Sequence, residues 1–226
     1  MRVVNDMRNY LWDSKKFLYA EINGIKYGFE DEDCKKYFDD ADLYDWTSEL
    51  EESLVTIFNK YKMKIFVCHE LENNNDDSNL CSLGNSTIFI RSYDSSKDAL
   101  YHGIGHLICY DYKMYGNSLL MYTIAKEATP FVKLVADYYY DCAKKKYPND
   151  QKIEKRLYNF LLKENIYLLN PIEYLPEAFA MYYCNKTKLH SECPLTYRLV
   201  DAMIHYYLWG CSYIKDSIKK LNLNQE

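Results

Sequence analysis

The hydrophobic pattern of this chain changes partway along its length, and the change limits the folds that it can adopt. After residue 115 the pattern is mostly helical, with predicted helices at roughly 118–145, 150–165, 174–186 and 196–220. The strand-like segments precede residue 95. A small mixed sheet from the first part of the chain, with helices gathered in the second part, is typical of the α+β class.

Three segments in the first part of the chain predict β-structure. KFLYAEINGIKYGFE predicts a hairpin, because Asn23-Gly24 suits the type I′ turn that joins two short strands. MKIFVCHE and STIFIRS predict two further strands, and the polar island ENNNDDSN between them is typical of a solvated loop. The second of these strands contains Ile88, Phe89, Ile90 and Arg91.

Two helices accompany these strands. Residues 45–61 predict an amphipathic helix, with Leu54 and Phe58 on one face. DSSKDALYHGIGHLICYDYKM predicts another helix, on which an apolar stripe is formed by Leu100, Ile104, Leu107 and Ile108. We expect one compact unit overall, with residues 1–44 as an N-terminal hairpin extension and residues 45–226 as the main domain.

Charge and hydropathy exclude some partners and favour a compartment. The net charge of −5 argues against a nucleic-acid partner, because phosphate binding depends on clustered Lys and Arg. We expect no membrane span, since no apolar run approaches about 20 residues. The N-terminal sequence has no signal-peptide pattern, which predicts a cytoplasmic protein, with a secreted effector as the alternative. The oligomeric state is left open.

The cysteines predict free thiols. There are eight of them, and none forms a CxxC pair of the kind found in zinc ribbons or thioredoxin-like sites. Several lie in apolar runs, such as Cys109 in LICY and Cys184 in MYYC. A thiol in such a run behaves as a small hydrophobic side chain. We therefore expect reduced cysteines.

The segment ALYHGIGHLICYDY contains the strongest chemical motif. His102 and His106 are four residues apart, so on a helix they lie one above the other. Two imidazoles placed in this way can reach one metal ion at about 2.0–2.1 Å, which is why the spacing recurs in zinc sites. The alternative is a pair of hydrogen-bonded histidines without a metal.

The glycines of this helix and a later proline add to the prediction. Gly103 and Gly105 each disfavour the helix by about 1 kcal/mol relative to alanine. Gly105 therefore predicts that another segment packs closely against the backbone. In YLPEAFAMYY, Pro176 and Glu177 resemble a helix start, which would place a carboxylate in the first turn. Two histidines and Glu177 predict a three-ligand site with a position left for water.

These segments resemble a known family. STIFIRSYDSSKDALYHGIGHLICYDY is similar to the edge strand, loop and active-site helix of the zincins related to anthrax lethal factor and the clostridial Pro-Pro endopeptidases, which carry H-E-x-G-H there. PEAFAMYY resembles their third-ligand helix. The resemblance covers roughly residues 45–115 and 165–205, and it implies a zincin-like fold. It also implies that zinc is bound by His102, His106 and Glu177.

The same resemblance implies how a substrate would bind. An extended peptide would add its backbone to the edge of the sheet along the strand around Ile88–Arg91. An extended peptide or a protein is therefore the expected partner.

The departures from the family bear on activity. Gly103 stands where the family has its catalytic glutamate, and Asn170 stands where it has its transition-state tyrosine. Tyr174 and Tyr167 lie near that position as substitutes. A base displaced to another place would have to come from Glu127, Glu173 or Glu70. Gly103 is either native or an engineered replacement, and the sequence does not distinguish the two.

Three functions follow from these observations. The first is a catalytically impaired pseudo-protease, toxin-like or effector-like, that binds or inhibits a protein. The second is an active zinc metallopeptidase with a displaced base. The third is a helical interaction protein without a metal. Separately, His69-Glu70 at the end of MKIFVCHE is interpreted as a strand end facing water rather than as a ligand pair.

Overall fold

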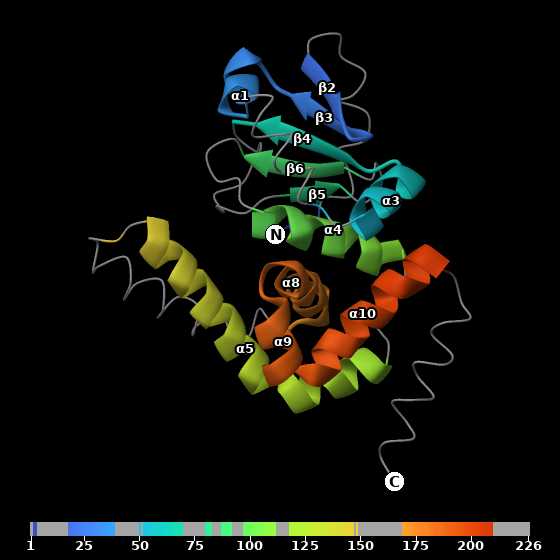
Figure 1. Cartoon of the computed structure of the whole chain (residues 1–226), viewed down its shortest axis with the longest axis vertical. Helices are drawn as coiled ribbons and strands as arrows, with labels where there is room; N and C mark the ends of the chain where they lie inside the picture. The colour runs from blue at the N-terminus through green and yellow to red at the C-terminus, as the bar shows by residue number, and fades with distance from the viewer. Residues whose placement is uncertain are drawn as a thin grey trace.

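The chain folds into an α+β structure, as the sequence predicts. The computed structural model describes residues 2–3, 18–38, 50, 52–69, 80–82, 87–91, 97–111, 118–146, 148 and 169–209. A mixed sheet lies at one end, helix α4 lies beside it, and the long helices α5, α8 and α10 lie beyond α4 (Figure 1). Among the described helices, none has both the length and the hydropathy that crossing a membrane requires.

The sheet has the order β1-β5-β6-β4-β3-β2 within the described residues. Strands β3, β4 and β6 run parallel to one another, whereas β2 and β5 are antiparallel to their neighbours β3 and β6. The short strand β1 pairs in parallel with β5. The strands are β1 (Arg2–Val3), β2 (Leu18–Ile22), β3 (Ile25–Phe29), β4 (Lys64–Cys68), β5 (Leu80–Ser82) and β6 (Thr87–Arg91).

The predicted hairpin is confirmed. Strands β2 and β3 are joined by Asn23 and Gly24, whose φ angles of 52° and 79° are those that a type I′ turn requires. The hairpin is not separate from the sheet, because β3 pairs with β4 over Lys26–Phe29. The segment predicted as an N-terminal extension therefore supplies two strands of the main sheet.

The prediction that Ile88–Arg91 lies along a free sheet edge is not supported. Ile88 of β6 pairs with Ile65 of β4 on one side and with Cys81 of β5 on the other. Strand β5 was missed because it is only three residues long and follows a polar island. Over Thr87–Phe89, the backbone groups of β6 are therefore already shared with two neighbouring strands.

Five described helices, α3, α4, α5, α8 and α10, correspond to predicted segments but differ in their bounds, whereas α1 and α9 were not predicted. The predicted helix at 150–165 and the start of the helix at 45–61 lie outside the described residues. The predicted segment at 174–186 begins earlier, and the following helix is preceded by an additional short one. The bounds are α1 (Glu32–Tyr37), α3 (Glu52–Tyr61), α4 (Lys97–Asp111), α5 (Ser118–Lys146), α8 (Pro171–Cys184), α9 (Lys186–Glu192) and α10 (Pro194–Trp209).

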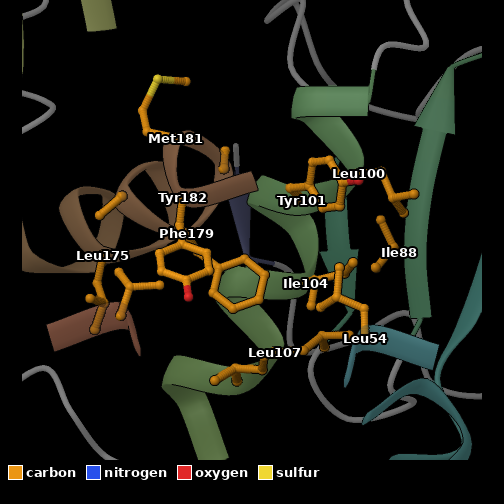
Figure 2. Packing of buried hydrophobic residues seen from close by; sticks show 14 of the residues in the cluster. Leu54, Ile88, Leu100, Tyr101, Ile104, Leu107, Leu175, Phe179, Met181 and Tyr182 are labelled. Atoms are coloured by element: carbon orange, nitrogen blue, oxygen red, sulfur yellow. The ribbon is translucent and has the colours of Figure 1, made fainter. Parts of the chain in front are cut away.

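Helix α4 is buried between the sheet and α8. Leu100 and Ile104 of α4 face Ile88 of β6 and Leu54 of α3, whereas Phe179 of α8 lies on the opposite side of α4 (Figure 2). All five side chains are at most 1% exposed. The predicted apolar stripe is therefore confirmed, and the other side of α4 packs against α8.

Gly105 allows α4 and α8 to approach closely. A Cβ atom at this position would lie 2.7 Å from Pro176 Cα and 3.1 Å from Phe179 Cβ. Those distances are shorter than ordinary van der Waals contacts between carbon atoms. The expectation that a segment packs against the backbone at Gly105 is confirmed, and the segment is the middle of α8.

Glu127 of α5 is a buried carboxylate that caps another helix. Its two oxygens accept hydrogen bonds from the backbone N–H groups of Leu195 and Thr196, both at 2.8 Å. The Thr196 hydroxyl donates to it at 2.7 Å. These donors belong to the first turn of α10, where N–H groups have no partner within the helix. Glu127 thus fixes α10 against α5.

We expect the Glu127→Ala substitution to lower the free energy of unfolding by about 2–3 kcal/mol, because it leaves buried N–H donors without an acceptor. Chemical denaturation followed by circular dichroism measures the loss. Glu127→Gln is the matched control, since an amide oxygen in place of Oε2 can still accept both bonds from Thr196, and it should lose less. Equal stability of Glu127→Ala and the parent protein would contradict the capping role.

The cysteines whose side chains the structure describes are free, as predicted. They are Cys34, Cys68, Cys109, Cys142, Cys184 and Cys193. Burial raises the pKa of the Cys109 thiol well above its ordinary value, so this residue is an inert part of the core.

Candidate metal centre

Two histidines from α4 and one glutamate from α8 converge on a common point. The Nε2 atoms of His102 and His106 are 3.1 Å apart. The Oε2 atom of Glu173 lies 3.3 Å from each of these nitrogens. The three donor atoms therefore form a nearly equilateral triangle, and the group can hold a metal ion.

The triangle has the dimensions of one face of a tetrahedral metal site. For metal–ligand bonds of about 2.0–2.1 Å, the edges of a tetrahedron are about 3.3–3.4 Å. The observed edges of 3.1, 3.3 and 3.3 Å match this value closely. Two imidazole nitrogens facing each other at 3.1 Å would otherwise need a proton between them. A single cation would satisfy all three donors at once.

The site is largely shielded from water. The side chain of His106 is 0% exposed, that of Glu173 is 6% exposed and that of His102 is 12% exposed. The side of His102 is thus where solvent comes closest to the three donor atoms. A shielded site strengthens charge interactions, because the effective dielectric constant is lower than in water.

Charge and burial set different protonation states for the three groups. Burial lowers the pKa of His106 to about 4, although its hydrogen bond to Glu173 acts in the opposite direction. Burial also opposes protonation of His102, but hydrogen bonds to Glu173 and Glu177 outweigh it and raise its pKa. The pKa of Glu173 is lowered, because hydrogen bonds to the two histidines overcome the effect of burial. A neutral His106 and an ionised Glu173 are the forms that bind metals.

The third ligand predicted from the sequence, Glu177, occupies a different place. Its Oε2 atom lies 2.8 Å from Nδ1 of His102, on the ring nitrogen that faces away from the triangle. A carboxylate at the second nitrogen of a ligating histidine fixes the orientation and tautomer of the ring. The structure therefore differs from the sequence prediction: Glu173 completes the triangle and Glu177 holds His102.

Tyr139 of α5 extends this arrangement. It is half-buried, and desolvation and the nearby Glu177 carboxylate raise its pKa well above the ordinary value. The sequence shows only an aromatic run at this position, with no sign that the middle ring is the one beside the histidine helix. Glu177 thus lies near both His102 and Tyr139.

The sequence predicted Glu177 instead of Glu173 as the third ligand because it placed the start of α8 too late. The sequence predicts a helix over 174–186, with Pro176 and Glu177 resembling its start, but the helix begins at Pro171. Asn170 is the N-cap, and its side-chain oxygen accepts a hydrogen bond from the N–H of Ile172 at 3.1 Å. Asn followed by Pro is a favourable start for a helix, so this signal was present in the sequence.

The other candidates for catalysis are engaged elsewhere. Tyr174 is fully buried, and its hydroxyl lies 2.6 Å from Thr196 Oγ1, so it is a core residue rather than a substrate-facing one. Glu127 caps α10, and Asn170 caps α8. Gly103 is buried on α4 beside the site and offers no side chain. Glu70 and Tyr167 lie outside the described residues.

Comparisons with known proteins found no relative. No protein-family model, curated protein or solved structure matches this chain. The interpretation of the site therefore rests on its own geometry.

Proposed function

We propose that this chain is a zinc-binding protein of zincin type whose peptidase chemistry is impaired and which acts as a protein-binding or inhibitory module. The observation that carries the proposal is the triangle of donor atoms from His102, His106 and Glu173, with edges of 3.1–3.3 Å. The three donor atoms also come from the same elements as in a zinc peptidase: two histidines lie one turn apart on one helix, and a carboxylate lies on a later helix.

The donor set favours zinc. Two imidazole nitrogens and one carboxylate oxygen are the ligand types of open catalytic zinc sites, in which water takes the fourth position. Zinc in such a site acidifies bound water and polarises a carbonyl group. His102, His106 and Glu173 would hold the ion, and Glu177 orients His102. The deep burial of His106 and Glu173 keeps water away from the protein side of the ion.

The impairment follows from the absence of a base among the described candidates. Gly103 has no side chain, and Glu173 is needed as a ligand. Glu127 and Tyr174 are held by hydrogen bonds to Thr196. A positioned general base contributes about 10²–10⁴-fold to such a reaction. Peptide hydrolysis should therefore be slow even with the metal in place.

Restoring a carboxylate at Gly103 tests this proposal. We expect the Gly103→Glu variant to hydrolyse a peptide library at least about 100-fold faster than the parent protein, because it regains the missing base. The activity should disappear with a chelator and in the Gly103→Glu, His106→Ala double variant. Gly103→Gln is the matched control, since it adds similar volume without a base.

Two results would contradict the proposal. One is chelator-sensitive cleavage by the parent protein at a rate equal to that of Gly103→Glu, which would mean that a base is already present. The other is a near-zero zinc content in both the parent protein and His106→Ala, measured by elemental analysis. Circular dichroism and zinc content of each variant show that the fold and the site persist.

A further inference from the structure

A second group of metal-ligating side chains lies at the edge of the sheet. It consists of Asp31, Cys34 and His69, whose ligand atoms all lie within 4.8 Å of one another. Asp31 and Cys34 come from the junction between β3 and α1, and His69 directly follows β4. Because β3 and β4 are parallel, their carboxyl ends meet at the same edge, and the three side chains come together there.

The backbone around this group is fixed by the sheet. The N–H of Glu30 donates to the carbonyl oxygen of Val67 at 3.0 Å, which continues the pairing of β3 with β4. The N–H of His69 donates to Glu30 Oε2 at 2.8 Å. Asp31 accepts a hydrogen bond from the N–H of Cys34 at 2.9 Å. The backbone hydrogen bonds therefore hold the three metal-ligating side chains close together without a metal ion.

The side chains are arranged with the sulfur inside and the other donors outside. Cys34 is 0% exposed, whereas the side chains of His69 and Asp31 are 46% and 47% exposed. His69 Nε2 lies 3.1 Å from one carboxylate oxygen of Asp31 and 2.9 Å from the other. An ordinary buried cysteine is surrounded by apolar groups. Cys34 belongs to the hydrophobic core, but its sulfur also lies within 4.8 Å of a carboxylate oxygen and an imidazole nitrogen.

We propose that Asp31, Cys34 and His69 form a second metal site, which binds a divalent transition metal ion such as Zn²⁺ and joins the start of α1 to the end of β4. Thiolate, imidazole and carboxylate are all zinc ligands. A tetrahedral ion with a Zn–S bond of about 2.3 Å places sulfur and nitrogen about 3.5 Å apart, and the ligand atoms here already lie within 4.8 Å of one another. The exposed side of the group leaves the fourth position to water.

Cys34 must lose its thiol proton when it binds a metal ion. Burial raises the pKa of the Cys34 thiol to about 11, and the Asp31 carboxylate raises it further in the same direction. Without a metal the residue is therefore a neutral thiol. A bound cation compensates the charges of the thiolate and the carboxylate, and the thiol proton is released to solvent as the metal–sulfur bond forms.

Cobalt(II) distinguishes this site from the His102–His106–Glu173 group. A thiolate bound to Co²⁺ gives a near-ultraviolet charge-transfer band, and the first site contains no sulfur. Titration of the chain with Co²⁺ should give this band, and in His106→Ala, where the first site is disabled, the band should saturate at one equivalent. The Cys34→Ser variant should lose the band completely. His106→Ala, which disables the first site, and Cys142→Ser, which removes an exposed cysteine, should both keep it.

A second variant, His69→Ala, keeps the proposal testable if Cys34→Ser fails to fold. His69 is half exposed, so His69→Ala is expected to fold, and its affinity for Co²⁺ at this site should fall at least tenfold, as judged by the band. The proposal is overturned if the folded parent protein gives no thiolate band, if the band survives in Cys34→Ser, or if His69→Ala binds as tightly as the parent. None of these results bears on the first site, which is assayed through His106→Ala.

Discussion

The Glu173→Gln substitution is expected to reduce zinc affinity more than 100-fold, whereas Glu177→Gln is expected to reduce it about 10–100-fold. Glu173 lies 3.3 Å from both ligating nitrogens, so its loss removes a ligand. Glu177 contacts only Nδ1 of His102, and glutamine at 177 can still accept that hydrogen bond through its amide oxygen. Competition with a chromophoric chelator measures both affinities.

The pair of variants is matched, because each exchanges one buried carboxylate for an amide on the same face of α8. Their order of effect separates a ligand from a residue that orients a ligand. The reverse order, with Glu177→Gln losing the metal and Glu173→Gln retaining it, would restore the sequence-based choice of Glu177. Thermal unfolding of the metal-free variants shows whether either change disturbs the fold itself.

The second large effect is expected at Gly105. The Gly105→Ala substitution should lower the free energy of unfolding by about 2 kcal/mol, because the added Cβ overlaps the backbone of α8. The overlap is with Pro176 Cα at 2.7 Å, and a backbone atom cannot rotate away as the end of a flexible side chain can. Alanine is otherwise the better helix former by about 1 kcal/mol, so the sign of the change is diagnostic.

Gly105→Ala should also weaken zinc binding. Separation of α4 from α8 moves Glu173 away from His102 and His106, whose 3.3 Å distances depend on the contact of the two helices. Denaturant titration and chelator competition on the same preparation measure the two effects. A variant as stable as the parent would mean that α8 can shift without loss, and the helix contact would then not set the geometry of the site.

Several elements were accessible from sequence because their causes are local. The hairpin depends on the turn at Asn23-Gly24, where both residues have positive φ. The stripe on α4 depends on the spacing of residues such as Leu100 and Ile104. Turn chemistry and helical periodicity act over a few residues, so a single sequence contains them.

Other elements depended on the rest of the molecule. Strand β5 contains only Leu80–Ser82, which is too short for a periodic pattern, and it exists because β6 offers it a partner. The pairing of β6 on both sides follows from that strand, and it removes the predicted free edge at Ile88. Likewise, nothing in the run of three tyrosines shows that Tyr139 lies beside Glu177.

The sequence by itself determined that His102 and His106 face the same direction, since residues four apart on one helix always do. It also supplied two glutamates, Glu173 and Glu177, which are again four apart and share a face of α8. Which of the two completes the triangle with the histidines depends on the position of α8 along its own axis, and a shift of one helical turn, about 5.4 Å, would exchange them. The packing of α8 against α4, with Pro176 close to Gly105, decided this position, because contacts between two helices set their relative placement and neither sequence pattern does so alone.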